Sequence, residues 1–456
     1  MRALQPLLIA LTVVATSFGA TSLGAQTVVP VREVSPVEAK STEKFGNIFG
    51  VRELAGGKVL VNDGVRRQLV VVDARLSNGR VVLDSTSDSG NSYGPKAAPL
   101  IPFVGDSSLF VDGSSQTLLV IDRDGKIAHV RSAPKASDLR YLASGASAVD
   151  SRGNIVYRGA NTPRPRAPTT NGQPGKPPLI MTTPDSAPVI RANFETRAID
   201  TVGRVKIQNG SRLSMEQDVN GKQTSTMIVD PTVNVDEWAL LADGTIAMVR
   251  GHDYHVDLLF PDGRKISSQK IPFDWKRLTD ADKQAIIDSA RAAQEKIDAD
   301  NRAAAVAKGA ALSADGKLMI DVKSGSMIAN AAGKSSGADG MGPPPIVQRM
   351  AAPVTVYVPL SEMADYYPPI RPGATKADLD GNLWVLPTTS AQSKQGELVY
   401  DVISNKGELL QRVRMPDGRS VAGFGRNGVV YLMYKDGSAG WVLERTKIVK
   451  AERASE

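Results

Sequence analysis

The sequence predicts an all-β fold, and three observations support that prediction. Apolar segments occur in pairs, each pair is joined by a tight turn with Gly beside Asp or Asn, and the pairs recur in phase along the chain. Gly suits these hairpin turns because they need a positive φ, which strains residues with a side chain. Four short strands with two turns, repeated about every 40–50 residues, are typical of a propeller blade. The predicted fold class is therefore a six-bladed β-propeller.

Six copies of the first hairpin of a blade can be identified. The flanking Val, Leu, Ile, Trp and Tyr residues suit a pleated, buried surface. The copies are Val51–Val61, Pro102–Val111, Ala148–Tyr157, Trp238–Val249, Ala377–Leu386 and Val421–Tyr431. Where no insertion intervenes, the turn glycines keep the blade spacing, as Gly105 and Gly153 do. Two β-sandwich domains would also contain many strands, but they do not require paired hairpins that recur in phase.

A second hairpin follows in most copies. These hairpins are expected at Gln68–Asp84, Thr117–Arg131, Val189–Gln208, His255–Ile271 and Glu397–Met415. The fragment Ala311–Ile320 also has a strand–turn–strand form but lacks a second hairpin, so we interpret it as a decoration rather than a seventh blade. The stretch Thr27–Ser35 is expected to add a strand to the last blade, which would close the ring and protect an open edge.

Three segments interrupt the repeat and are predicted to be insertions. Residues 161–188 are rich in Pro and are expected to form a loop without secondary structure inside the third blade. Residues 278–307 are expected to form a surface helix, since Thr279 and Asp282 match a capping box and the apolar stripe is narrow. Residues 323–352 are rich in Gly, Ser and Pro and are expected to be flexible. Such insertions commonly flank a functional mouth, although lengthening a surface loop also costs little free energy.

The first 25 residues match an export signal. Arg2 supplies a positive start, Leu7–Val14 is an apolar run too short to span a bilayer, and the small residues of Gly19–Ala25 offer a cleavage site after Ala25. The remaining chain, residues 26–456, is expected to form a single propeller domain that is secreted or periplasmic. No later segment has the length and apolarity of a transmembrane span.

The composition excludes several classes of function. The chain has no Cys and only three His, which excludes thiol chemistry and disulfides and makes multi-histidine metal sites hard to build. The formal net charge of +7 falls to +6 once Arg2 is removed with the signal. Because the basic residues are scattered among acids rather than clustered, nucleic acid is not an expected partner.

Two stretches resemble known propellers. Asp380–Val385 resembles the inner hairpin of six-bladed propellers of the NHL-like and TolB-like kind. Asp236–Asp257, with the helix expected after it, resembles a large, mostly uncharacterised group of secreted bacterial propellers. The resemblance covers most of Gly46–Val449 and implies the fold. It does not imply one activity, because such propellers include binding modules, lactonases, lyases and assembly factors.

One polar and aromatic cluster supplies candidate binding residues at a mouth of the channel. These candidates are Asp236, Glu237, Arg250, His252, Tyr254 and His255. On a strand, alternate residues share a face, so His252 would group with Tyr254, and His255 with Asp253 and Asp257. Arg250 could bind an anion in the channel or form a cross-strand ion pair. No catalytic or metal-binding residue is assigned.

The sequence favours a binding or scaffold protein over an enzyme. Such a protein would hold a protein, peptide or glycan at its channel mouth and would need no cofactor. The alternative is a metal-dependent hydrolase or lyase of the lactonase type. Resemblance to those enzymes implies one Ca²⁺ or Mg²⁺ ion on the channel axis, held by oxygen ligands. Its candidate ligands here are Asp150, Asp236, Glu237 and Asp378, which do not occupy equivalent positions, and Asp150 also fits a turn residue.

Overall fold

The computed structural model describes most of the chain. The described residues are 29–85, 92–93, 99–113, 115–144, 146–160, 179–181, 184–207, 211–217, 223–307, 319–323, 347–351, 354–389, 393–394, 396–437 and 440–448. The predicted export signal lies outside them, as do residues 161–178 and 324–346 of two predicted insertions.

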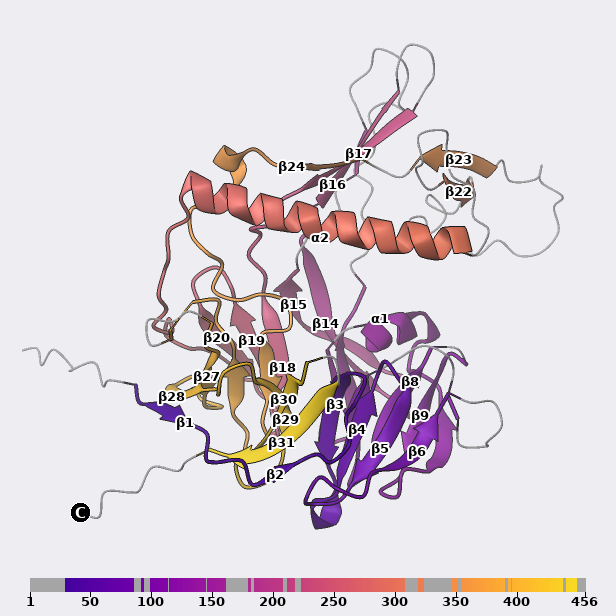
Figure 1. The fold of residues 1–456 in the computed structure, drawn as a ribbon, viewed down its shortest axis with the longest axis vertical. Coiled ribbons are helices and arrows are strands. Elements are labelled where there is room, and N and C mark those ends of the chain that lie inside the picture. Colours follow the sequence, from indigo (N-terminus) through magenta and orange to yellow (C-terminus); the bar gives the residue numbers. More distant parts are fainter. Residues whose placement is uncertain are drawn as a thin grey trace, which may run out of the picture.

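Six sheets form the blades of a propeller (Figure 1). Blade 1 consists of β3 (Ile48–Glu53), β4 (Val59–Asp63), β5 (Gln68–Val72) and β6 (Arg80–Asp84). Blade 2 consists of β7 (Leu100–Pro102), β8 (Ser108–Asp112), β9 (Thr117–Ile121) and β10 (Ile127–Arg131). Blade 3 consists of β11 (Ser147–Val149), β12 (Asn154–Arg158), β14 (Ser186–Asn193) and β15 (Ile199–Lys206).

The second half of the ring repeats this plan. Blade 4 consists of β18 (Glu237–Leu240), β19 (Ile246–Arg250), β20 (His255–Leu259) and β21 (Lys265–Ser267). Blade 5 consists of β25 (Thr375–Ala377), β26 (Leu383–Val385), β27 (Val399–Ile403) and β28 (Leu409–Arg414). Blade 6 consists of β29 (Ser420–Phe424), β30 (Val429–Lys435), β31 (Trp441–Lys447) and the N-terminal strand β2 (Ala39–Lys40).

The first strand of each blade is the innermost one. The first strands of successive blades contact each other from blade 6 through blade 1 to blade 5, which places them around the axis. Apolar side chains fill the spaces between blades, as Trp238 does between blades 3 and 4 and Trp384 does between blades 5 and 6. The turn glycines behave as predicted, with a φ of 88° at Gly381 and 77° at Gly153. The predicted six-bladed propeller is confirmed.

The prediction of ring closure needs a correction. Residues of β1 (Val31–Glu33) pair in parallel with β28 of blade 5, whereas blade 6 is joined only by Val34 and Ser35 from the predicted stretch and by the later strand β2, which pairs with β31. The N-terminal segment therefore crosses from one blade to the next and covers the outer edge of both. Each of those edges would otherwise present unpaired backbone groups, which explains why one short segment serves two sheets.

The insertions form a layer on one face of the ring. A four-stranded sheet has the order β13 (Leu179–Met181), β16 (Ser211–Gln217), β17 (Gln223–Val229) and β24 (Val354–Tyr357). The strands β22 (Met319–Lys323) and β23 (Val347–Ala351) form a separate pair. In Figure 1 the long helix α2 (Asp280–Ala307) lies between this layer and the blades, and the short helix α1 (Leu139–Ser144) lies beside blade 2.

All of these insertions leave the ring at the same end. They arise between β12 and β14, between β15 and β18, and between β21 and β25. Because successive strands alternate in direction, each of these connections emerges where the innermost strands begin. We call this end of the propeller the insertion face.

The insertion layer differs in part from the prediction. The loop predicted for 161–188 contains the strand β13 and ends earlier, since β14 begins at Ser186. The hairpin of β16 and β17 was not predicted at all. Residues 311–318 of the predicted decoration lie outside the described residues, and the strand β22, which contains the last two residues of that fragment, belongs to no blade.

The helix α2 forms where it was expected. Its capping box is present: the Thr279 backbone N–H donates to Asp282 Oδ2 at 2.9 Å, and the Asp282 N–H donates to Thr279 Oγ1 at 3.2 Å. Ile287 packs against Val358 and Met363. Among the residues that the structure describes, no helix is both long enough and apolar enough to cross a membrane.

Candidate functional site

Asp236 and Arg250 form an ion pair at the insertion-face end of blade 4. Arg250 Nη1 lies 2.8 Å from Asp236 Oδ2, and Arg250 Nε lies 2.7 Å from Asp257 Oδ2. The same Asp236 carboxylate accepts hydrogen bonds from the backbone N–H groups of Lys206 and Gly251. The cross-strand ion pair, one of the two alternatives for Arg250, is therefore present within blade 4, and the backbone groups of Lys206 and Arg204 connect it to blade 3.

His255 has the two acidic neighbours that the sequence predicted. Its Nδ1 lies 2.6 Å from Asp253 Oδ1, and its Nε2 lies 3.3 Å from Asp257 Oδ1. The predicted grouping of His252 with Tyr254 is wrong, because residues 251–254 form the turn between β19 and β20 rather than a strand. A Cβ at Gly251 would lie 1.9 Å from the Val235 carbonyl oxygen, so only glycine fits this turn.

Tyr254 and Glu237 are buried between blades 4 and 5. The Tyr254 hydroxyl donates to Asp401 Oδ2 at 2.7 Å, and burial raises the pKa of this phenol well above its ordinary value. Glu237 accepts a hydrogen bond from the Gly373 backbone N–H, and burial raises the pKa of its carboxyl. Of the six predicted binding residues, only His252 is exposed. Partner binding by these residues stays a prediction.

The carboxylates named for the metal alternative do not converge. Asp150 and Asp378 lie in turns that follow innermost strands, whereas Asp236 and Glu237 lie where an innermost strand begins, at the opposite end of the ring. Asp378 is used in its own turn, where it accepts hydrogen bonds from the N–H groups of Asp380 and Asn382. Within the described part of the chain, no group of three or more His, Asp or Glu residues could hold a metal ion.

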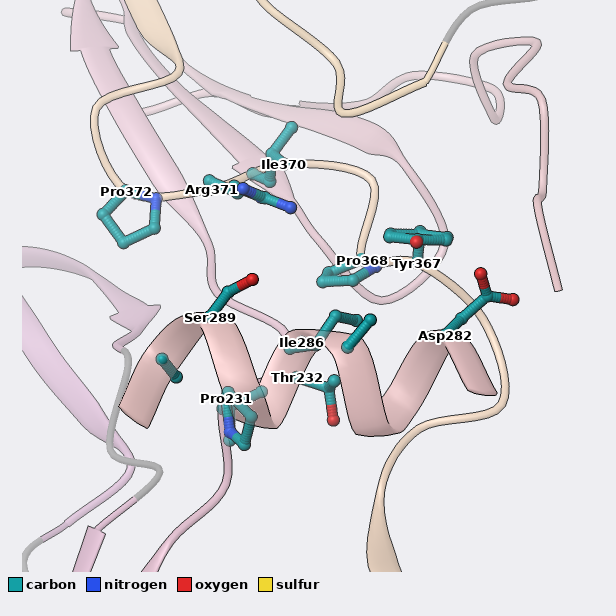
Figure 2. Close-up of a pocket in the computed structure, with 13 residues that line it drawn as sticks. Pro231, Thr232, Asp282, Ile286, Ser289, Tyr367, Pro368, Ile370, Arg371 and Pro372 are labelled. Carbon is teal, nitrogen blue, oxygen red and sulfur yellow. The ribbon is translucent and has the colours of Figure 1, made fainter. Parts of the chain in front are cut away.

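A cavity of about 640 Å³ lies on the insertion face, between α2 and the segment that leads into β25 (Figure 2). Its lining combines one side of α2 with the segments after β17 and before β25. The lining residues are Pro231, Thr232, Val233, Asp282, Ala285, Ile286, Ser289, Ala290, Tyr367, Pro368, Ile370, Arg371 and Pro372. A second cavity of about 330 Å³ shares Arg371 and Pro372 with the first and extends over Gly373, Ala374 and Thr388 of blade 5.

The wall opposite α2 is held by proline geometry and backbone hydrogen bonds. Proline fixes φ and has no N–H to satisfy, so the segment with Pro368, Pro369 and Pro372 stays extended. The Pro369 carbonyl accepts from the Thr388 N–H at 2.9 Å, and the Tyr367 N–H donates to the Lys276 carbonyl at 3.0 Å. The cavity therefore has a preformed wall.

Three polar side chains in this lining are available to a ligand. Asp282 caps α2, and Thr232 Oγ1 donates to Asp230 Oδ1 at 2.7 Å. By contrast, the Arg371 guanidinium and the hydroxyls of Ser289 and Tyr367 make no hydrogen bond or ion pair with another described residue. Figure 2 shows Arg371 on the segment that faces α2 and Ser289 on the helix across from it.

Two exposed aromatic residues adjoin this cavity. Trp275 is 44% exposed and Tyr366 is 47% exposed, and their ring centroids lie 6.4 Å apart in an edge-to-face arrangement. Tyr366 directly precedes the lining residue Tyr367, and the Lys276 ammonium lies 5.3 Å from the centre of the Tyr367 ring.

The sequence prediction missed this site. The cavity forms by packing α2 against segments that are distant in the sequence, and no local pattern reports such packing. One signal was available: the stretch Tyr366–Pro372 holds two tyrosines, three prolines and an arginine directly before an innermost strand. A run of rigid residues around one cation, on a connection between blades, is a reasonable sign of a binding wall.

Comparisons with known proteins give relatives in fold only. No family model matches the chain, and no curated protein matches it. A virginiamycin B lyase from Staphylococcus aureus is similar over 89% of this chain and 97% of its own, with 10% identity and a TM-score of 0.31. A protein of unknown function from Bacteroides thetaiotaomicron covers 92% of this chain and 75% of its own, with 10% identity and a TM-score of 0.36. A member of the DUF4221 family from Bacteroides vulgatus is similar over 93% of this chain and 98% of its own, with 9% identity and a TM-score of 0.36.

Proposed function

We propose that this chain is an exported binding or scaffold protein that holds a partner at the insertion face of its propeller. The observation that carries the proposal is the cavity between α2 and Tyr367–Pro372. A concave lining that combines apolar side chains with a few available polar groups is the usual form of a binding site in a protein. Export is supported by the signal pattern of the first 25 residues.

The construction of the site favours binding with little rearrangement. Lys283 of α2 is buried, and its ammonium lies 3.0 Å from Asp365 Oδ1 and 3.2 Å from the Leu360 carbonyl. The opposite wall is anchored to blade 5 through Thr388. Because both walls are fixed before a partner arrives, less ordering free energy is lost on binding.

One of the residues predicted from the sequence contacts the wall of the second cavity. Gly373, which lines that cavity, donates its backbone N–H to the buried Glu237 carboxyl of blade 4. Glu237 therefore supports the segment that carries the wall, while the cavity offers the accessible surface.

Site-specific photo-crosslinking tests the proposal. A photoreactive amino acid placed at Ser289, inside the cavity, should crosslink one defined partner in the cell envelope. The same amino acid at Gln284, exposed on another side of α2, is the matched control and should not. The partner is then purified and shown to bind the unmodified protein. Equal crosslinking from both positions, or none from Ser289, would overturn the proposal.

A further inference from the structure

We infer that the cavity under α2 is a site for an apolar group that carries a carboxylate, with the carboxylate bound by Arg371 and the apolar group held against Ile286 and Pro368. This inference rests on the proposed function and names the class of ligand for the same site.

The apolar part follows from the lining. Ile286, Ala290, Pro368 and Pro372 present hydrocarbon, and a volume of about 640 Å³ is large enough for a bulky side chain or a short acyl chain. Covering these side chains with an apolar group is favourable, because it removes hydrocarbon from water. They therefore offer a surface for the apolar part of a ligand.

The carboxylate follows from Arg371. A guanidinium is planar and offers a fork of N–H donors that matches a carboxylate with two parallel hydrogen bonds. Arg371 is exposed, and no acidic side chain in the described ranges pairs with it.

The acids around the cavity are engaged elsewhere. Asp282 holds the cap of α2, and Asp365 pairs with Lys283. Glu397, which lines the second cavity, pairs with Arg414 at 3.0 Å. These carboxylates are therefore not available to neutralise Arg371, and an anionic ligand would fill that role.

A single arginine between apolar walls suits a monoanion. A phosphate carries about two charges near neutral pH and needs several donors, which this lining does not supply. A carboxylate needs one guanidinium, and the Ser289 hydroxyl on the facing helix can donate a further hydrogen bond. The ligand could come from two sources with this chemistry: the C-terminus of a peptide that ends in an apolar residue, or a free apolar carboxylic acid.

Titration calorimetry with matched probes tests the inference. The peptide probes are N-acetylated tetrapeptides ending in Phe, Leu or Val, each as the free acid and as the C-terminal amide; the non-peptide probes are decanoate and decanamide. We expect an acid of one source to bind at least about tenfold more tightly than its amide, which corresponds to one charged hydrogen-bonded contact. The source whose acid binds more tightly, peptide or free carboxylic acid, identifies the ligand.

Three variants assign the effect to the site. Arg371→Gln should remove the preference for acid over amide, and Ala290→Trp, which fills the cavity, should weaken binding of both forms. Arg264→Gln, in an exposed turn of blade 4, is the matched control and should change nothing.

The outcomes separate this inference from the proposed function. If acid and amide bind equally, or if Arg371→Gln keeps the preference, the carboxylate site is wrong. If the carboxylate site is wrong but Ala290→Trp abolishes binding of the crosslinked partner, the proposed function stands without the carboxylate site. If no probe of either source binds, the ligand class named here is overturned, whereas the crosslink from Ser289 decides the function separately.

Discussion

The hydroxyl of Tyr254 in blade 4 donates to the carboxylate of Asp401 in blade 5 at 2.7 Å, and both side chains are buried. Asp401 also accepts from Arg412 Nε at 2.9 Å, and Arg412 Nη2 donates to the Pro272 carbonyl at 2.7 Å. Pro272 belongs to the segment that leads to α2. This hydrogen-bond chain fastens two blades to each other and to the base of the insertion that forms the cavity.

Replacing Tyr254 should therefore destabilise the ring. Tyr254→Phe leaves a buried carboxylate with one donor fewer, so the free energy of unfolding should fall by about 1–3 kcal/mol. Urea denaturation measures the change. The control is Tyr366→Phe, at an exposed position, which should leave stability unchanged. Equal stability of the two variants would show that the Tyr254 hydrogen bond does not hold the blades.

The buried Glu237 carboxyl should make stability depend on pH. Since burial raises its pKa in the folded protein, the folded state binds more protons than the unfolded chain between the ordinary and the raised pKa. Its contribution to stability is therefore present at the acidic side of this window and is lost as pH rises through it. Glu237→Gln should remove this slope, which urea denaturation at about pH 5 and about pH 7 would measure. An unchanged slope in the variant would refute this role.

The ion pairs of Arg250 should matter for stability rather than for binding. Arg250→Gln removes two carboxylate contacts within blade 4 and the hydrogen bond from Arg250 Nη1 to the Arg204 carbonyl of blade 3, so the free energy of unfolding should fall by about 1.5–3 kcal/mol. Crosslinking from Ser289 should persist at temperatures where the variant is folded. A variant that keeps its stability but loses the crosslink would instead place the binding site at Arg250.

The N-terminal segment should contribute to ring closure. Removing residues up to Ser41 deletes β1 and β2 and three backbone hydrogen bonds to β31, donated by the N–H groups of Ser35, Glu38 and Ser41. The free energy of unfolding should fall by about 2–4 kcal/mol. Thermal unfolding followed by circular dichroism measures this. The control, Val37→Ser at an exposed position, should unfold like the unaltered chain; a truncated chain that does the same would contradict the closing role.

The blades could be predicted from the sequence because their signals are local. An Asp-Gly turn such as Asp380–Gly381, with apolar residues on both sides, specifies a hairpin over about ten residues. The strand that closes blade 6 was expected within Thr27–Ser35 rather than at β2, because β2 is two residues long and takes its structure from its partner β31. The sheet of β13, β16, β17 and β24 was missed for the same reason, since its strands come from three separate connections.

The candidate site was likewise predictable only where its signals are local. The sequence correctly placed acidic residues next to His255, but residue types alone do not distinguish an ion-pair network from a binding surface. Asp236 and Arg250 use their hydrogen-bonding groups on each other and on the backbone. Arg371 differs from them, because its guanidinium makes no hydrogen bond or ion pair with another described residue.

The most direct test of the account is the dissociation constant of the partner crosslinked from Ser289, measured with two tryptophan variants of α2. Ser289→Trp places the indole inside the cavity, and Gln284→Trp places it on the exposed side of the same helix. The account predicts that Ser289→Trp weakens binding by about tenfold or more, while Gln284→Trp leaves it unchanged. Unchanged affinity in Ser289→Trp, or an equal loss in both variants, would contradict the claim that the partner occupies the cavity.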